Sequence, residues 1–182
     1  ELVAIPYHEA YKDQVEQVAA LLKEAADLTD DSTLANFLNL RAEAFLTDDY
    51  FDSDMAWMDL AGDLEIVISP YEVYEDELFN YKAAYEAFLC RVDHAESEKL
   101  ATVASYLNEM EASLPIPDKH KNFDRGSSSP IKVVNELFAA GDTKAGIQTT
   151  AFNLPNDERV REAKGSKKVM LKNIARAKFD KC

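Results

Sequence analysis

Glycine, proline and cysteine are scarce in this sequence of 182 residues, which contains only 5, 6 and 2 of them, respectively. So few glycines and prolines argue against a collagen-like, solenoid or loop-rich chain. One of the two cysteines, Cys182, is the last residue, so we expect no structural disulfide with Cys90. Two scattered cysteines are typical of a reducing compartment, and the sequence therefore predicts a cytoplasmic protein.

Motifs of a self-sufficient hydrolase are also missing. The three histidines are His8, His94 and His120, and no two of them are four residues apart, as a helix that binds a metal with two imidazoles requires. The sequence contains no Gly-x-Ser-x-Gly segment and no phosphate-binding glycine loop. Cys90 and His94 are close enough in sequence to meet on a helix, but such neighbours are usually incidental. We therefore expect neither metal ligands nor a complete hydrolytic enzyme within this chain.

Acidic residues outnumber basic residues, and the formal net charge is −14. Nine lysines and arginines against three acids give residues 158–182 a charge of +6, so the first 157 residues carry −20. Such an acidic body repels nucleic acid and anionic membranes, and no stretch approaches the roughly 18 apolar residues that a membrane-spanning helix needs. Neither nucleic acid nor a membrane is therefore an expected partner. The basic end is either a solvated helix face that pairs with the acidic body or a site for polyanions.

The first 62 residues show the three- and four-residue spacing of amphipathic helices. One helix is predicted over residues 9–28, and Thr29–Ser32 ends it and offers capping side chains for the next helix. A short third helix over Met55–Leu60 contributes Trp57 to the core. The core residues predicted for the first two helices are Val15, Val18, Leu22, Ala25, Leu34, Phe37, Leu38, Ala42 and Phe45.

The pattern changes to that of strands after residue 62. Leu64–Ile68 is short and β-branched and is soon followed by Pro70, which favours a strand. Residues 71–76 continue in an extended conformation. Lys82–Cys90 is ambiguous, because its alanines favour a helix whereas its aromatic residues favour a strand.

A long helix is predicted over Asp93–Leu114, with a regular apolar face and with prolines after its end. Residues 118–130 are linker-like, and strands are predicted over Ile131–Val134 and Gly146–Phe152. The last segment, Val169–Phe179, has a helix-like pattern and no Gly or Pro terminator, which indicates a fragment of a longer protein.

These elements predict the α+β class. A helical segment, residues 1–62, precedes an α+β segment, residues 63–182, that combines mixed or antiparallel strands with the long helix.

Two segments carry groups that are suited to peptide binding. In the first, Glu72, Tyr74 and Asp76 face one side if the segment is a strand. A carboxylate beside a phenol can hold an ammonium group and a carbonyl oxygen. A solvated edge strand with aromatic packing explains the same residues, and on local sequence alone it is the simpler interpretation.

The second segment is Phe152–Arg159, in which Asn153 and Asn156 lie on either side of a proline. Two amides three residues apart can hydrogen-bond a peptide backbone. A plain turn with Asn and Asp caps is again the simpler interpretation from the local sequence.

Four segments, in order along most of the chain, resemble the dipeptidyl peptidase III family of zinc metallopeptidases. The similarity is strongest to the divergent branch that is fused to a nudix hydrolase domain in plants. The segments are residues 44–60, Ser69–Phe88 (SPYEVYEDELFNYKAAYEAF), Ala140–Glu158 (AGDTKAGIQTTAFNLPNDE) and Gly165–Asn173 (GSKKVMLKN).

The resemblance implies two lobes around a wide cleft, one built partly on a β-barrel that holds the peptide and one mostly helical that holds zinc. It assigns Glu72 to the ammonium group at the peptide N-terminus, and Asn153 and Asn156 to the peptide near that end. It gives Tyr74 a catalytic role, a hydrogen bond to the scissile carbonyl or its oxyanion. An anchored ammonium group fixes how far the cleaved bond lies from the end of the chain.

Two departures limit what the resemblance implies. The zinc motif of the family, His-Glu-x-x-Gly-His or a shorter form, is absent, so the zinc-binding lobe is expected beyond Cys182. Glu75–Phe79 replaces the Arg-Asp-Pro-Phe-Gly of the archetypal family. This difference leaves open whether the protein releases true dipeptides from a peptide.

The predicted function is therefore the substrate-binding part of a zinc-dependent peptidase that grips a peptide N-terminus. The alternative is a non-catalytic, acidic peptide-binding module without the metal site. Expected partners are a peptide and, if the protein is processed, the remainder of its own cleaved chain.

Overall fold

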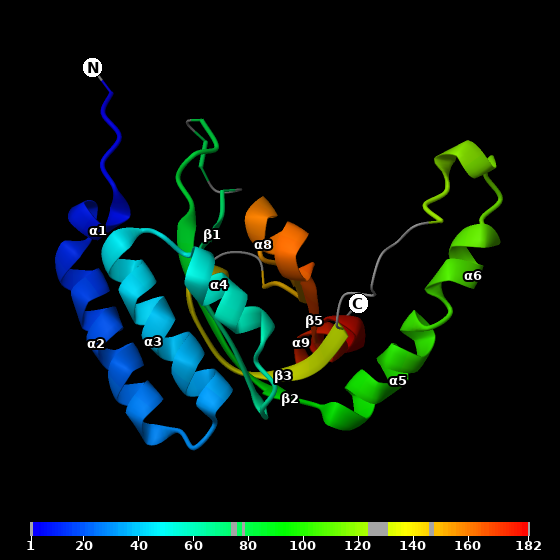
Figure 1. The fold of residues 1–182 in the computed structure, drawn as a ribbon, viewed down its shortest axis with the longest axis horizontal. Coiled ribbons are helices and arrows are strands. Elements are labelled where there is room, and N and C mark those ends of the chain that lie inside the picture. Colours follow the sequence, from blue (N-terminus) through cyan, green and yellow to red (C-terminus); the bar gives the residue numbers. More distant parts are fainter. Residues whose placement is uncertain (1, 74–75, 78, 124–130, 146–147, 182) are drawn as a thin grey trace.

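Four helices begin the chain, and strands interspersed with further helices follow, so the predicted α+β class is confirmed. The computed structural model describes residues 2–73, 76–77, 79–123, 131–145 and 148–181. A helical layer from the first third of the chain covers one face of a curved sheet, and further helices follow (Figure 1). Among these described residues, no helix is both long enough and apolar enough to span a membrane.

The helical layer consists of α1 (Tyr7–Ala10), α2 (Lys12–Leu28), α3 (Ser32–Thr47) and α4 (Phe51–Met58). The Asp31 carboxylate caps α3 by accepting the backbone N–H groups of Thr33 and Leu34 at 2.9 and 3.2 Å. All five core residues predicted for α3 are buried. In α2 the buried residues are Val15, Ala19, Leu22 and Ala26, at steps of four, three and four residues. Ala25, which was predicted to belong to the core, is therefore exposed.

The five-stranded sheet has the order β1-β2-β3-β5-β4 and forms a half-barrel. β1 (Leu64–Glu72) pairs with β2 (Ala84–Val92), and β2 with β3 (Ile131–Gly141), both antiparallel. β5 (Lys167–Leu171) is parallel to β3 and antiparallel to β4 (Ala151–Leu154). The predicted mixed sheet is confirmed, and its edge strands are β1 and β4.

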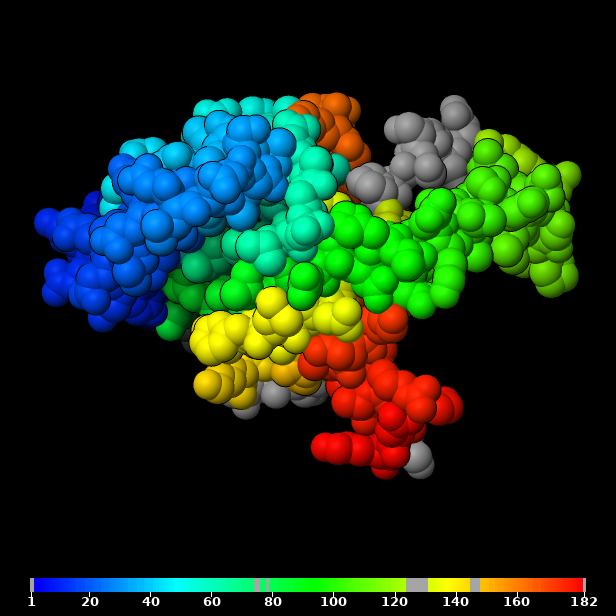
Figure 2. Space-filling view, turned by 90° about the horizontal axis from the view of Figure 1, so that it is seen from below, coloured from blue at the N-terminus to red at the C-terminus, as the bar shows by residue number. Residues whose placement is uncertain are grey.

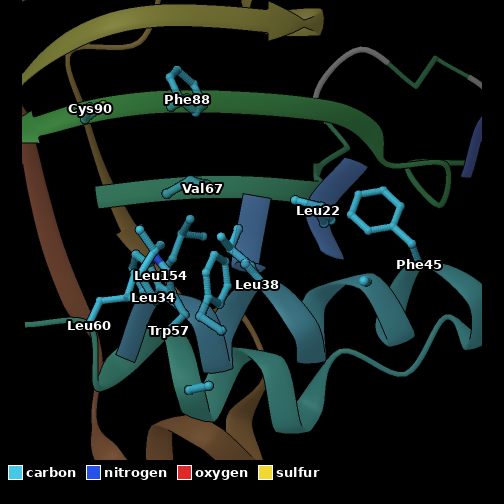
Figure 3. Packing of buried hydrophobic residues seen from close by; sticks show 14 of the residues in the cluster. Leu22, Leu34, Leu38, Phe45, Trp57, Leu60, Val67, Phe88, Cys90 and Leu154 are labelled. Atoms are coloured by element: carbon cyan, nitrogen blue, oxygen red, sulfur yellow. The ribbon is translucent and has the colours of Figure 1, made fainter. Parts of the chain in front are cut away.

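The hydrophobic core lies between the helical layer and the sheet (Figure 3). Trp57 from α4 and Phe37 from α3 are at most 2% exposed, and they share the cluster with Val67 of β1 and Phe88 of β2. Leu154 at the end of β4 belongs to the same cluster. The core therefore joins the N-terminal helices to both edge strands of the sheet.

The long helix predicted over residues 93–114 is present as two helices, α5 (His94–Ala104) and α6 (Leu107–Ala112). The Ser105 hydroxyl donates to the Thr102 carbonyl at 2.7 Å, a local bond that competes with regular helix geometry. The two helices project from the body of the molecule (Figures 1 and 2). The predicted apolar face is consequently not buried against the described residues, and Val103 and Met110 are 48% and 50% exposed.

Other boundaries differ from the sequence predictions. The ambiguous segment is the strand β2, and β3 extends to Gly141. The helix predicted over residues 169–179 begins only at Lys172, as α9 (Lys172–Lys181). The residues before it, 167–171, alternate between buried and exposed positions and form the strand β5 beside β3. The predicted strand over residues 146–152 starts only at Ala151, while residues 146 and 147 lie outside the described part.

Short helices complete the chain. They are the 3-10 helix η1 (Asp118–His120), α7 (Asp142–Ala145) and α8 (Glu158–Lys164). Most of the predicted linker, residues 124–130, lies outside the described residues.

Candidate functional site

A cavity of about 600 Å³ opens on the inner face of the half-barrel. Residues of both edge strands, β1 and β4, line it together with residues of β2 and α7. Its lining residues are Val67, Tyr71, Glu72, Glu86, Phe88, Asp142, Thr143, Thr149, Ala151, Phe152, Asn153, Leu154 and Asn156. The mixture of carboxylates, amides and apolar groups suits a ligand with a charged end and an apolar body.

Three of the four residues predicted as site residues line this one cavity. Glu72 comes from the end of β1, Asn153 from β4 and Asn156 from the loop after β4. The fourth, Tyr74, lies outside the described residues. Asp76, which was expected to face the same side as Glu72, does not line the cavity, because its carboxylate accepts the backbone N–H groups of Tyr81 and Lys82 at 2.7 and 3.1 Å.

A bulge in β1 explains how Glu72 reaches the cavity. Strand alternation would place Glu72 on the face opposite Val67, because an odd number of positions separates them. The register with β2 shifts between Pro70 and Glu72, so the strand bends there. As a result Tyr71 and Glu72 both line the cavity. Pro70 is tolerated at this position because β1 is an edge strand.

The two asparagines present free amides. Asn153 lies in β4 opposite Lys168, and the bond between Leu154 and Pro155 is cis. Asp157 then caps α8 by accepting the Arg159 backbone N–H at 2.9 Å. Asn153 and Asn156 are exposed, and their side chains make no hydrogen bond within the described part of the chain. Their donors and acceptors are therefore available to a ligand.

The cavity also contains two carboxyl groups that the sequence analysis missed, Glu86 and Asp142. Burial, and then the carboxylates of Glu72 and Asp142, raise the pKa of Glu86 to about 7. Glu86 belongs to the segment that was ambiguous between helix and strand. On a strand Glu86 shares a face with Phe88, another cavity residue. If Lys82–Cys90 had been predicted as a strand, Glu86 would have been expected beside Phe88.

Tyr71 adds a phenol to the cavity wall. Burial raises the pKa of this phenol to about 12, so its hydroxyl stays protonated at neutral pH. Tyr71 stands directly before Glu72 in the sequence. The sequence analysis considered Tyr74, and not Tyr71, as the phenol that contacts a ligand.

A buried ion cluster joins the strands β1, β3 and β5. Lys167 on β5 is 1% exposed, and its Nζ lies 3.1 Å from Oε1 of Glu65 on β1. It also donates to the Trp57 carbonyl at 2.6 Å and lies 4.0 Å from the centre of the Trp57 ring. Lys132 on β3 donates to Oε2 of Glu65 at 2.7 Å. Glu65 is therefore compensated by two lysines from two other strands.

No group of three or more His, Cys, Asp or Glu side chains in the described ranges is arranged to hold a metal ion. Two of the three histidines pair with acids instead, His8 with Asp48 and His94 with Asp63, each at 2.8 Å. These residues therefore do not fit a catalytic zinc ion.

A family model described as "Peptidase family M49" matches residues 4–182. Over 180 residues the chain is 42% identical to "Nudix hydrolase 3" of Arabidopsis thaliana, covering 99% of this chain and 23% of the relative. Over 129 residues it is 30% identical to "Dipeptidyl peptidase 3" of Nematostella vectensis, covering 69% of this chain and 17% of the relative. The chain thus spans a quarter or less of the curated relatives it matches.

Two solved structures have the same arrangement of elements. The structure of DPP III from Caldithrix abyssi matches with a TM-score of 0.93 and 65% identity, over 99% of this chain and 34% of that one. The structure of dipeptidyl-peptidase III from Corallococcus sp. strain EGB matches with a TM-score of 0.85 and 51% identity, over 98% of this chain and 33% of that one.

Proposed function

Because the chain belongs to peptidase family M49, we propose that it is the substrate-binding part of a zinc-dependent dipeptidyl peptidase and grips the amino end of a peptide. The observation that carries this proposal is the single cavity of about 600 Å³ shared by Glu72, Asn153 and Asn156. Its three groups come from opposite edges of the sheet. A peptide end that enters the cavity therefore meets a carboxylate on one side and two amides on the other.

The chemistry of these groups matches a peptide N-terminus. The Glu72 carboxylate pairs with the ammonium group, a charge-assisted contact that is stronger than a neutral hydrogen bond. The amides of Asn153 and Asn156 can both donate to a peptide carbonyl and accept from a peptide N–H group. Apolar side chains from Val67, Phe88 and Phe152 contact the first side chain of the peptide.

Fixing the amino end determines which bond is presented for cleavage. When the ammonium group is held at one point, an extended peptide places each carbonyl at a set distance from it. Tyr74 follows Glu72 by two residues, and we assign it the hydrogen bond to the scissile carbonyl.

In this proposal, zinc is a cofactor of the longer protein. It supplies an activated water when bound, and residues outside this chain hold it. Within the chain, residues 1–62 support the sheet and residues 63–182 form the substrate-holding lobe, with a zinc-binding lobe across the cleft.

Peptide binding tests the proposal without requiring catalysis. We expect the protein to bind tetra-alanine with a free amino end at least about 10-fold more tightly than N-acetyl-tetra-alanine in isothermal titration calorimetry. Glu72→Gln should remove most of this preference, because it removes the charge that pairs with the ammonium group. Glu98→Gln on α5 is the matched control, since Glu98 is exposed and lies on another element, outside the cavity. Equal affinity for the two peptides in the unmodified protein would refute the proposal.

A further inference from the structure

The loop that carries Asn156 leads directly into α8, and α8 contacts α4 of the N-terminal helical layer (Figure 1). Val160, in the first turn of α8, is fully buried. At the far end of α8, Lys164 donates to the Met55 carbonyl at 3.2 Å and pairs with Asp59. The amide side of the cavity is therefore attached to a helix that lies outside the cavity.

Arg159 makes a second contact with α4, at the near end of α8. Its guanidinium group forms a bidentate hydrogen bond with the Asp157 carboxylate, with Nε 3.1 Å from Oδ1 and Nη2 2.5 Å from Oδ2. Its Cζ atom lies 4.7 Å from the centre of the ring of Phe51, the first residue of α4. Asp157 follows Asn156 directly, so one side chain links the loop to the helical layer.

Two anchors determine where the exposed residue Asn156 lies. On one side, Leu154 and Pro155 are buried and fix the end of β4. On the other side, the chain is held at Asp157, whose carboxylate accepts the Arg159 backbone N–H at 2.9 Å in addition to the guanidinium group. The second anchor therefore depends on Arg159.

We propose that Arg159 is a positioning residue for peptide binding, which clamps Asp157 against Phe51 and so holds the Asn156 amide at the cavity. Arg159 is not among the residues that line the cavity, so it acts through Asn156 rather than on the peptide. This inference rests on the proposed function, because Asn156 is one of the residues assigned there to the peptide.

The geometry of this clamp requires an arginine. Exposed ion pairs generally contribute little, but a planar guanidinium group that binds both carboxylate oxygens holds one geometry. Its face can lie on an aromatic ring at the same time, whereas the ammonium group of a lysine is a point charge on a flexible stem. The hydrogen bond from Arg159 also lowers the pKa of Asp157, so this carboxylate stays ionised at neutral pH.

A double-mutant cycle tests whether Arg159 acts through Asn156. The ligand is tetra-alanine, and isothermal titration calorimetry measures its affinity. We expect Asn156→Ala to weaken binding about 5- to 10-fold, because it removes a side chain that hydrogen-bonds the peptide. Arg159→Met should weaken binding about 3- to 5-fold, but it should add almost nothing in a protein that already carries Asn156→Ala. Additive losses would overturn the inference, since Arg159 would then affect binding independently of Asn156.

Conservative variants test the shape of the clamp. Arg159→Lys keeps the charge but loses the bidentate bond and the flat contact with Phe51, so it should weaken binding nearly as much as Arg159→Met. Phe51→Tyr keeps the ring and should bind normally, whereas Phe51→Leu should weaken binding about 2- to 3-fold. Normal binding by Arg159→Lys would overturn the inference, since the charge alone would then suffice.

Arg176→Met on α9 is the matched control. Arg176 also pairs with a carboxylate, that of Asp180 at 2.8 Å, and its Cζ atom lies 5.9 Å from the centre of the Phe179 ring. It does not line the cavity, so this variant should keep the affinity of the unmodified protein. A loss in Arg176→Met equal to that in Arg159→Met would overturn the inference, because any exposed arginine would then have the same effect.

Stability measurements separate positioning from a general loss of folding. Arg159 is exposed, so urea unfolding of Arg159→Met should resemble that of the unmodified protein. A loss of binding that only follows a loss of folded protein would overturn the inference. Arg159→Lys repeats the test with a smaller change of the side chain, so the inference stays testable if Arg159→Met does not fold.

The preference for a free amino end distinguishes the two proposals. Arg159→Met should keep the preference for tetra-alanine over N-acetyl-tetra-alanine, because this preference depends on Glu72. If the unmodified protein shows the preference but Arg159→Met or Asn156→Ala binds tetra-alanine normally, the positioning role fails and the proposed function survives. If the unmodified protein shows no preference, the proposed function itself fails.

Discussion

Lys167 on β5 and Glu65 on β1 form a buried ion pair, Nζ to Oε1 3.1 Å, between strands that are not neighbours in the sheet. Burial lowers the pKa of Lys167 to about 8, and the Glu65 carboxylate acts in the opposite direction by favouring the charged amine. The pair spans the interior of the half-barrel and holds β1 close to the β4–β5 edge. The spacing between Glu72 and Asn153 therefore depends on a contact that lies outside the cavity.

Replacing Lys167 should destabilise the fold. Among the described residues, Lys167→Met leaves Lys132 as the single cationic partner of Glu65. It also removes the 2.6 Å hydrogen bond to the Trp57 carbonyl, which then keeps only the weaker bond from the Leu60 backbone N–H at 3.3 Å. We expect the free energy of unfolding to fall by about 2–4 kcal/mol in urea titrations. Lys168→Met, at an exposed position of the same strand, should change it by less than about 0.5 kcal/mol. Equal effects of the two substitutions would show that the buried pair contributes nothing specific.

The second buried pair should be at least as sensitive. Arg41 is fully buried, donates to Asp54 at 2.6 Å, and lies about 5 Å from the ring centres of Phe37 and Tyr50. Asp54→Asn keeps the shape and removes the compensating charge, so the free energy of unfolding should fall by about 3 kcal/mol or more. Asp52→Asn, two residues earlier in α4 and exposed, is the control for the same change. A loss below about 1 kcal/mol in Asp54→Asn would contradict the prediction.

Glu86 should make stability depend on pH. Its folded-state pKa of about 7 is above its ordinary value, because burial and two carboxylates disfavour the ionised form. The protonated form thus contributes stability below about pH 4.5, and this contribution is lost as the pH rises through about 7. Glu86→Gln lacks the titration, so it should gain roughly 1 kcal/mol relative to the unmodified protein between about pH 5 and pH 8, after allowance for partial exposure.

Thermal unfolding at the two pH values measures this gain, and Glu98→Gln controls for the general loss of one negative charge. A stability difference between Glu86→Gln and the unmodified protein that stays constant with pH would rule out the titration of Glu86.

Removal of zinc should separate chemistry from binding. If residues outside this chain hold the metal, a chelator should abolish peptide hydrolysis by the longer protein that contains this chain, while calorimetry still detects tetra-alanine binding with nearly unchanged affinity. Loss of binding together with hydrolysis would mean that the metal contributes to gripping the amino end. Peptide binding without hydrolysis even after zinc is supplied would favour the non-catalytic peptide-binding module.

Much of the fold was predictable because its local patterns are strong. The apolar face of α3, the capped start of that helix and the strand β1 each follow from short-range spacing. The exposed face of α5 and α6 shows the limit of such patterns. The regular spacing of Val103 and Met110 predicts an apolar stripe, but spacing does not say which surface covers it.

The candidate site divides in the same way. Glu72, Asn153 and Asn156 were identified through resemblance, since each has a simpler explanation in its local sequence. Glu86 and Asp142 were missed because their proximity depends on the register between β2 and β3 and on the corner at Gly141. Those are long-range properties, and no window of the sequence contains both residues.

The strand order has a consequence for how the cavity width is set. Glu72 and Asn153 belong to the first and last strands of the sheet, and three other strands separate them. A small change in curvature at each junction adds up across the sheet, so remote substitutions in β2 or β3 will alter the gap more than many local ones. Evolution and protein engineers can therefore widen or narrow the cavity without changing the residues that line it.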